Sequence, residues 1–253
     1  GTALTWTLVA GDGVNDADNA DFSFAGAVLQ LNADSDFETP ICGGDNTCQI
    51  RVNASDAGVN NTTLAMTISL TNVDDNEPVW VTAAAQAINE NNAPNAVVVA
   101  LNATDADTGD TVAYSIVGGD DQARFDINAG NLRLTATTDR EAAGLCGGDF
   151  VCEVTVRATD TLNADNPADR TFLVTINDVN EAPSISTGAA QSVAENAGVN
   201  AAVVTMAGSD PEGTALTWTL VAGDGVNDAD NADFSFAGAV LQLNADSDFE
   251  TPI

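Results

Sequence analysis

Two short acidic segments of this chain contain residues that could bind a metal ion. The first is NVDDNEP at 72–78 and the second is DVNEAP at 178–183, and their prolines stand 105 residues apart. Each segment lies between two runs in which apolar and polar residues alternate. Carboxylate and amide oxygens gathered without basic partners are the ligands that Ca²⁺ takes in proteins. The segments are therefore candidate Ca²⁺-binding linkers, and the alternative is a solvated polar spacer.

The charge of the chain limits the functions open to it. It has 38 acidic residues and 6 basic ones, all arginine, and its formal net charge is −32. Histidine and lysine are absent, which excludes histidine general bases, lysine Schiff bases and His-ligated zinc. Binding to nucleic acid or to an anionic membrane surface needs a basic footprint that this chain lacks. Disorder is the other interpretation of such acidity, but 44% of the residues are hydrophobic and they recur with strand periodicity.

The four cysteines form two pairs with the same spacing, in CGGDNTC at 42–48 and CGGDFVC at 146–152. Zinc would need further cysteine or histidine ligands nearby, and the CxxC spacing of redox sites is absent. We therefore predict two local disulfides, Cys42–Cys48 and Cys146–Cys152. Disulfides indicate an oxidising, extracytoplasmic compartment.

An internal repeat sets the domain organisation. Residues 213–253 repeat residues 1–41 letter for letter, at an offset of 212. A weaker period of 105 relates Glu90 to Glu195. Such self-similarity predicts an array, here one that alternates two related domain types. The expected boundaries fall at the acidic linkers, which gives a partial domain lacking its first strand at 1–77, a complete domain at 78–183 and a partial domain at 184–253.

Short runs with a period of two indicate β-strands throughout. Leu4, Trp6 and Leu8 share one face of the first such run, with threonines on the other face. Glycine, asparagine and aspartate separate the runs, and no segment has a 3.6-residue apolar period with helix caps. The pattern predicts an all-β chain of antiparallel β-sandwich domains with about seven strands each. Trp6, Trp80 and Trp218 are expected in the cores rather than as sugar-binding platforms.

Five short motifs recur in the same order in both halves. The first motif is the linker itself, and the second is x-Glu-x, at 89–91 and 194–196. The third is D-x-D at 105–107, which becomes Asp-Pro-Glu at 210–212, and the fourth is D-R-E at 139–141, which becomes Asp-Phe-Glu at 36–38. The fifth is A-x-D, at 158–160 and 54–56. In this the chain resembles tandem cadherin-like domains, in the form common in bacterial and archaeal surface proteins. The first linker is similar to the family's D-x-N-D-N-x-P, and the second is one residue shorter. The resemblance implies seven-stranded Greek-key sandwiches in a linear array.

The resemblance also implies that Ca²⁺ is bound between consecutive domains. The first domain would supply x-Glu-x and D-R-E, the linker its Asp and Asn oxygens, and the next domain D-x-D and A-x-D. The first junction would use Asp36, Glu38, Asp74, Asp75, Asn76, Asp105, Asp107 and Asp160. The second would use Glu90, Asp139, Glu141, Asp178, Asn180, Glu181, Asp210 and Glu212. The shorter linker and Glu212 in place of aspartate predict that the two junctions differ.

The expected function is structural. Ca²⁺-stiffened domains would form a stalk, filament or adhesin that is extracellular, either secreted or at the cell surface. Identical modules are better suited to extending a protein than to recognising varied ligands. The alternative is a Ca²⁺-dependent binding module for a polysaccharide or for homophilic contact between cells, so the expected partners are neighbouring copies of the array or a cell-surface ligand. Paired carboxylates can hydrolyse glycosides, but here a metal accounts for the acids, and we expect no enzymatic activity.

The loop that carries Asp12, Asp16, Asp18 and Asp21 is a weaker candidate for an additional ion. Its other interpretation is a solvated acidic loop.

Overall fold

The structure, a computed structural model, describes residues 3–11, 13–58, 60–107, 109–162, 166–223, 225, 228–246, 248 and 250. In the described residues all regular elements are β-strands and single turns of 3-10 helix, and there is no α-helix. The all-β architecture predicted from the alternating runs is therefore confirmed. Asp12 of the acidic loop lies outside the described residues.

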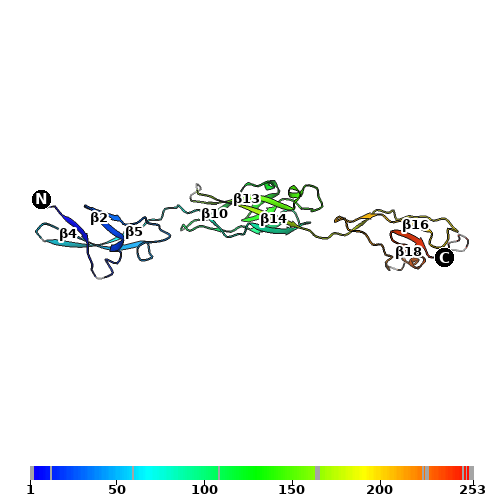
Figure 1. The fold of residues 1–253 in the computed structure, drawn as a ribbon, viewed down its shortest axis with the longest axis horizontal. Coiled ribbons are helices and arrows are strands. Elements are labelled where there is room, and N and C mark those ends of the chain that lie inside the picture. The colour runs from blue at the N-terminus through cyan, green and yellow to red at the C-terminus, as the bar shows by residue number, and fades with distance from the viewer. Residues whose placement is uncertain are drawn as a thin grey trace. The chain divides into compact units, whose positions relative to one another are not determined.

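The middle section, β6 to β14, has the most complete set of strands. Its segments are β6 (Val79–Trp80), β7 (Ala85–Asn89), β8 (Val97–Ala100), β9 (Ala103–Thr104), β10 (Val112–Gly118), β11 (Phe125–Asn128), β12 (Asn131–Leu134), β13 (Val151–Asp160) and β14 (Ala168–Asn177). They form a four-stranded sheet in the order β10-β13-β14-β7, a three-stranded sheet in the order β11-β12-β8, and a β6-β9 pair. The strand pairs β10–β13 and β13–β14 are antiparallel, and these three strands lie side by side in Figure 1. The nine segments amount to seven strands, because the first is interrupted between β6 and β7 and the second between β8 and β9.

Alternation along the strands builds the core of this section. In β13 every second residue is buried, and the buried set includes Val154, Val156 and Ala158. Successive side chains of a strand point to opposite faces of its sheet, so an alternating sequence gives one apolar face. Trp80 packs with ring centroids 5.5 Å from both Tyr114 and Phe172. This placement agrees with the expected core role of Trp80.

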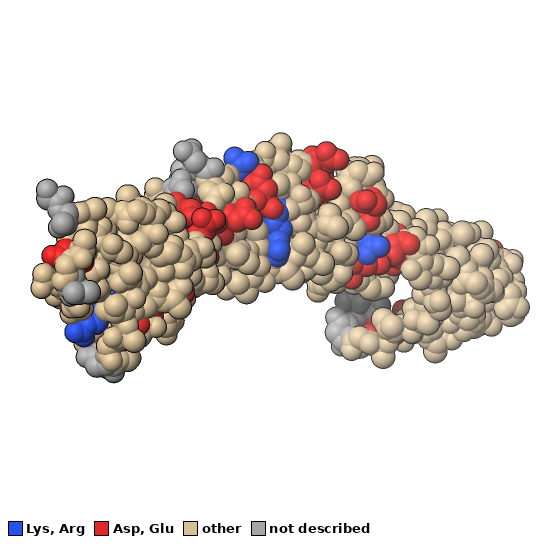
Figure 2. All heavy atoms as spheres, turned by 60° about the vertical axis from the view of Figure 1, so that its left-hand side comes forward, with Lys and Arg blue, Asp and Glu red and all other residues tan. Residues whose placement is uncertain are grey.

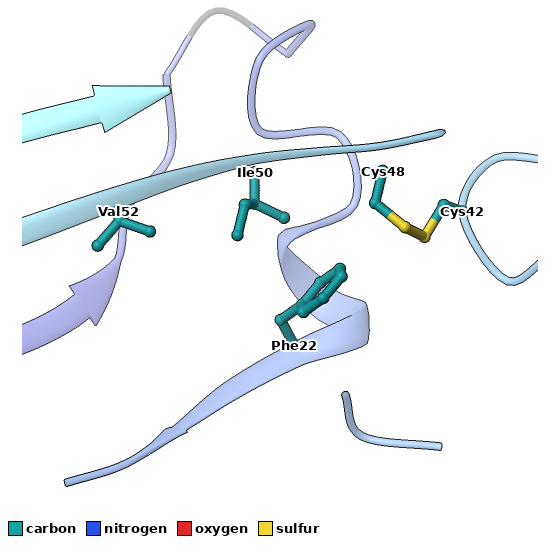
Figure 3. Packing of buried hydrophobic residues seen from close by; sticks show 5 residues of the cluster. All are labelled: Phe22, Cys42, Cys48, Ile50 and Val52. Carbon is teal, nitrogen blue, oxygen red and sulfur yellow. A yellow bond between two sulfur atoms is a disulfide. The ribbon is translucent and has the colours of Figure 1, made fainter. Parts of the chain in front are cut away.

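The N-terminal section repeats the second half of that arrangement. Its strands are β1 (Thr5–Leu8), β2 (Phe22–Ala25), β3 (Val28–Leu31), β4 (Thr47–Ser55) and β5 (Asn61–Ser69). They form a β1-β4-β5 sheet and a β2-β3 hairpin. Phe22, Ile50 and Val52 are buried between them, and the predicted disulfide joins Cys42 to Cys48 beside this core (Figure 3). Cys146 and Cys152 are also disulfide-bonded.

The C-terminal section contains β15 (Ser184–Ile185), β16 (Ala202–Thr205), β17 (Gly208–Ser209), β18 (Phe234–Ala237) and β19 (Val240–Leu243). These strands form a β16-β19-β18 sheet and a β15-β17 pair. Single turns of 3-10 helix precede several strands, namely η1 (Asn19–Asp21), η2 (Gln122–Arg124), η3 (Leu145–Gly148) and η4 (Asn231–Asp233).

Contacts between residues divide the chain into two compact units. One consists of residues 1–87, 93–136 and 151–175, and the other of residues 88–92, 137–150 and 176–253. The residues predicted for the first junction all lie in the first unit, and those predicted for the second junction all lie in the second. The division into domains at 1–77, 78–183 and 184–253 stays a prediction. Within the described part of the chain, no helix has the length and apolar character needed to cross a membrane.

Candidate metal centres

Seven carboxylates gather around the first linker, and we call them the first cluster. Carboxylate oxygens of Glu38, Asp75 and Asp107 lie within 4.8 Å of one another, and so do those of Asp74, Asp107 and Asp110. Asp107 is common to both groups and is only 4% exposed. The full cluster consists of Glu38, Asp74, Asp75, Asp105, Asp107, Asp110 and Asp160.

Asp107 connects the first linker to the loop that follows β9. Its Oδ2 accepts hydrogen bonds from the backbone N–H groups of Asp75 (3.2 Å) and Asn76 (2.9 Å). These bonds, that of Asn76 above all, hold the pKa of Asp107 below its usual range. The D-x-D segment is closed locally, because the backbone N–H of Asp107 donates to Asp105 Oδ1 (3.0 Å). Asp107 is therefore fixed in position as an anion.

Asp74 and Asp160 approach each other closely in the same cluster. Asp160 ends β13 and is fully buried. Burial, followed by a hydrogen bond to Asp160 and the charges of Asp160, Asp110 and Asp107, raises the pKa of Asp74 to about 6. Burial, followed by the neighbouring charge of Asp107, also raises the pKa of Glu38. Without a cation, these acids repel one another.

Two predicted residues of the first junction lie at the edge of the cluster. Asp36 accepts hydrogen bonds from the backbone N–H of Glu38 (2.9 Å) and from the Thr39 hydroxyl (2.5 Å). It thereby shapes the turn that presents Glu38. The side chain of Asn76 donates to Asp75 Oδ1 (3.3 Å).

The second linker has an equivalent cluster. Carboxylate oxygens of Glu90, Asp139 and Glu141 lie within 4.8 Å of one another. Glu90 is 3% exposed and accepts hydrogen bonds from the backbone N–H groups of Val179 (2.7 Å) and Arg140 (2.5 Å). Burial, followed by the charges of Glu90, Asp178 and Asp139, raises the pKa of Glu141. Glu90 thus ties the D-R-E loop to the second linker.

Glu181 and Glu212 form a carboxyl pair that extends the second cluster. The backbone N–H of Glu181 donates to Glu212 Oε1 (2.7 Å), and the two carboxyl groups lie close enough to interact. Their interaction, followed by burial, raises the pKa of Glu181 to about 7, and the same interaction lowers the pKa of Glu212 to about 2. The side chain of Asn91 also donates to Glu181. The two carboxyl groups therefore influence each other's ionisation.

The remaining predicted residues lie beside these groups. Asp178 is close enough to act on Glu141 through its charge, and the Asp210 side chain is hydrogen-bonded to that of Glu212. The side chain of Asn180 donates to the backbone carbonyl of Glu181 (3.2 Å). The structure thus gathers the predicted residues of the second junction into one region.

Arginine does not neutralise either cluster in the ion pairs of the described residues. Those pairs join Arg124 to Asp121, Arg133 to Asp126 and Arg157 to Asp169, all outside the two clusters. The guanidinium of Arg140, from the D-R-E motif, lies 4.4 Å from the centre of the Phe150 ring. Figure 2 shows that the acidic side chains on the visible face are gathered in groups rather than spread evenly.

The donor set fits Ca²⁺. Several carboxylate oxygens are inaccessible to solvent and have no hydrogen-bond partner within the described residues: Glu38 Oε1, Asp105 Oδ2, Asp107 Oδ1, both oxygens of Asp110, Glu181 Oε2 and Glu212 Oε2. A buried acceptor without a donor costs free energy, so these oxygens indicate a bound cation. Ca²⁺ holds oxygen ligands at about 2.3–2.6 Å. Oxygens that lie within 4.8 Å of one another can therefore share one ion.

The acidic loop near the N-terminus has a different role in its described residues. Asp18 Oδ2 accepts a hydrogen bond from the backbone N–H of Gln49 (2.6 Å), and Asp16 accepts from those of Gly11 and Gly13 (both 2.7 Å). Asp121 repeats the contact of Asp18, with the backbone N–H of Glu153 (3.0 Å). These carboxylates stabilise the loop conformation, so we propose no ion there.

Sequence reasoning missed Asp110, which follows the D-x-D motif by three residues and is part of no motif used above. The available signal was one further acid in the short loop after D-x-D. It also missed Asn166, whose side chain donates to the backbone carbonyl of Asp75 (3.0 Å).

Comparison with known proteins agrees with this arrangement. A family model for the cadherin domain matches residues 85–177. Mouse cadherin-17 is 25% identical over 166 residues, which is 60% of this chain, and the match spans only 20% of the length of that protein.

Solved structures match over a greater length. Repeats EC21–23 of human CDH23 match with a TM-score of 0.65 and 19% identity, covering 99% of this chain and 81% of that one. Repeats EC22–24 of mouse cadherin-23 match with a TM-score of 0.60 and 21% identity, covering 98% and 78%. At these identities the structural matches show the fold. Residues 85–177 therefore match the cadherin-domain family, and the chain as a whole shares the fold of tandem cadherin repeats.

Proposed function

We propose that this chain is a Ca²⁺-stiffened array of extracellular cadherin-like domains that serves as a stalk, filament or adhesin. One observation carries the proposal: at both linkers, buried carboxylate oxygens lack hydrogen-bond donors while the arginine ion pairs of the described residues lie elsewhere. Bound Ca²⁺ would supply the positive charge that these clusters lack. The disulfides favour an oxidising compartment.

Hydrogen bonds from the linker backbone to neighbouring acids hold part of each linker in place. Asp107 binds the backbone of the first linker, and Glu90 binds the backbone of the second at Val179. Glu38, Asp74, Asp75, Asp105, Asp107 and Asp160 would hold the ion or ions at the first junction. Glu90, Asp139, Glu141, Asp178, Glu181, Asp210 and Glu212 would do so at the second, with Asp36, Asn76 and Asn180 completing the two sets.

Removal of the cation would loosen the linkers. The carboxylates of each cluster then repel one another, as the raised pKa values of Asp74 and Glu141 indicate. The hydrogen bonds to Asp107 and Glu90 oppose this repulsion, but they join only a few backbone groups. We therefore expect a stiff joint with Ca²⁺ and a flexible one without it.

A structural role accounts for the repeat better than enzymatic activity does. Residues 213–253 are identical to residues 1–41, and repeating an unchanged module makes a protein longer without adding a new site. Neighbouring copies of the array, or a ligand at a cell surface, are the partners we propose.

Small-angle X-ray scattering of the full chain tests the stiffening. In millimolar Ca²⁺ the distribution of intramolecular distances should be narrow with a fixed maximum, and in excess chelator it should broaden. The same comparison with Glu90→Gln should show a broader distribution in Ca²⁺ than the unsubstituted protein, whereas Glu77→Gln, which changes an exposed linker acid, should behave like the unsubstituted protein. Identical distributions with and without Ca²⁺ would refute the proposal.

A further inference from the structure

Asp110 is a buried acid that the cadherin-like motifs of this chain do not include. It lies in the loop between β9 and β10, three residues after Asp107. Both of its carboxylate oxygens are inaccessible to solvent, and neither has a hydrogen-bond partner among the residues that the structure describes. A carboxylate in that position is either neutralised or bound to a cation.

Its surroundings favour a cation. One carboxylate oxygen each from Asp110, Asp74 and Asp107 lie within 4.8 Å of one another. The charges of Asp160, Asp105 and Asp107 all act on Asp110. Asp107, a member of the same group, supplies an independent observation, because it is only 4% exposed and its Oδ1 has no hydrogen-bond partner in the described part of the chain.

A purely structural role would need donors that the described residues do not provide. The turn is closed without Asp110, since the N–H of Asp107 donates to Asp105. Asp110 takes part in none of the ion pairs among the described residues, which join Arg124, Arg133 and Arg157 to Asp121, Asp126 and Asp169.

The second junction has no acid in the equivalent place. After Glu212 the chain continues as Gly213 and Thr214, and the backbone N–H of Thr214 donates to Asp210 Oδ1 (3.1 Å). A hydrogen bond that closes the turn therefore stands where the first junction has a carboxylate. The two junctions differ in this loop as well as in linker length.

We propose that Asp110 is an additional Ca²⁺ ligand, specific to the first junction, and that with Asp74 and Asp107 it makes this junction the tighter of the two. The inference rests on the proposed Ca²⁺ function and adds to it a residue that sets affinity. Because Asp110 repels its neighbours when no metal is bound, the same residue destabilises the metal-free junction.

The test uses the full chain and measures both states. Calcium binding is followed by titration calorimetry, and thermal unfolding is recorded in chelator and in millimolar Ca²⁺. Loss of one metal-site group typically costs about 10–100-fold in affinity, so Asp110→Asn should weaken the tightest class of sites by at least about tenfold. In chelator, Asp110→Asn should melt at a higher temperature than the unsubstituted protein, and in Ca²⁺ it should melt at a lower one.

Two further variants make the result decisive. Glu77→Gln removes the same charge from an exposed position in the first linker and should leave Ca²⁺ affinity unchanged. Asp110→Glu keeps the charge, so it should bind Ca²⁺ more tightly than Asp110→Asn. If the asparagine variant does not fold, the Ca²⁺ affinity of Asp110→Glu is compared with that of the unsubstituted protein instead.

The outcomes separate the inference from the proposed function. If the unsubstituted protein binds Ca²⁺ and Asp110→Asn binds it equally well, Asp110 is not a ligand and only the inference fails. If the unsubstituted protein binds no Ca²⁺, the proposed function fails, and the inference with it. A lower melting temperature of Asp110→Asn in both conditions, with unchanged affinity, would assign Asp110 a structural role and overturn the inference.

Discussion

The backbone N–H of Asn76 donates a hydrogen bond to the carboxylate of Asp107 (2.9 Å). The same relationship recurs at the second linker, where the N–H of Glu181 donates to Glu212 (2.7 Å). In each case the last acid of the D-x-D or Asp-Pro-Glu segment accepts a hydrogen bond from a backbone N–H of the linker. The local path of each linker is therefore set partly by these hydrogen bonds, and a bound cation would add to them.

Glu90 should contribute to stability even without metal. Replacing it by alanine leaves the N–H groups of Val179 and Arg140 without their acceptor. Hydrogen bonds to charged groups contribute about 1.5–3 kcal/mol each, so Glu90→Ala should lower the free energy of unfolding in chelator by at least about 2 kcal/mol. Urea unfolding measures this, with Glu77→Ala as the exposed control. Equal stability of the two variants would show that these bonds contribute little.

The pH dependence of stability should reverse when Ca²⁺ is added. In chelator, the pKa of Asp74 is raised to about 6 and that of Glu181 to about 7. An acid with a raised pKa binds more protons in the folded state, so the free energy of unfolding falls as pH rises from about 4 to about 7. Glu212, whose pKa is lowered to about 2, works in the opposite sense only below about pH 4.5.

Saturating Ca²⁺ changes the sign, because the metal binds the deprotonated carboxylates and so binds more tightly as pH rises. Melting temperatures at pH 5 and pH 8 should therefore decrease with pH in chelator and increase with pH in Ca²⁺. Parallel trends in the two conditions would show that the clusters do not bind the metal.

The Cys42–Cys48 disulfide should stabilise the N-terminal section. Both cysteines are buried beside Phe22 and Ile50. A loop with a sequence separation of 6 is short, and closing such a loop in the unfolded chain corresponds to about 2 kcal/mol. The double variant Cys42→Ala, Cys48→Ala should unfold at lower denaturant concentration, and reductant should shift the unsubstituted protein in the same direction. No shift in either experiment would contradict this account.

Adjacent residues on β14 should respond oppositely to truncation. Phe172 is fully buried, whereas Leu173 points to the other face and is 45% exposed. Truncating a buried phenylalanine costs about 3–5 kcal/mol, so Phe172→Ala should be severely destabilised. Leu173→Ala should change the free energy of unfolding by less than about 1 kcal/mol. Comparable losses in both variants would mean that the register of β14 is wrong.

A segment with a strand-like sequence forms a strand in this structure only where a partner strand lies beside it. The segment TWTL forms β1 at Thr5–Leu8, paired with β4, but the identical residues 217–220 form no strand. In the described residues no strand pairs with residues 217–220 as β4 pairs with β1. A strand is completed by hydrogen bonds to its neighbour, so identical residues give different structures when the neighbour differs.

The residues of the candidate sites could be predicted from the sequence where they belong to a recurring motif. The linkers and the D-x-D, D-R-E and A-x-D segments led to the residues that the structure gathers into two clusters. Asp110 has no motif, and its place in the first cluster depends on how the loop after Asp107 folds. The opposite pKa shifts of Glu181 and Glu212 likewise depend on how close the two side chains lie, which their spacing in the sequence does not give.

Titration calorimetry of the metal-free full chain with Ca²⁺ tests the central claim most directly. We expect saturable binding of several ions per chain, in at least two classes of affinity, with release of protons at pH 7 from the groups whose pKa is raised. Magnesium should compete weakly, because the clusters offer many carboxylates at distances suited to the larger ion. Absence of saturable binding at millimolar Ca²⁺ would contradict the assignment of both clusters as metal centres.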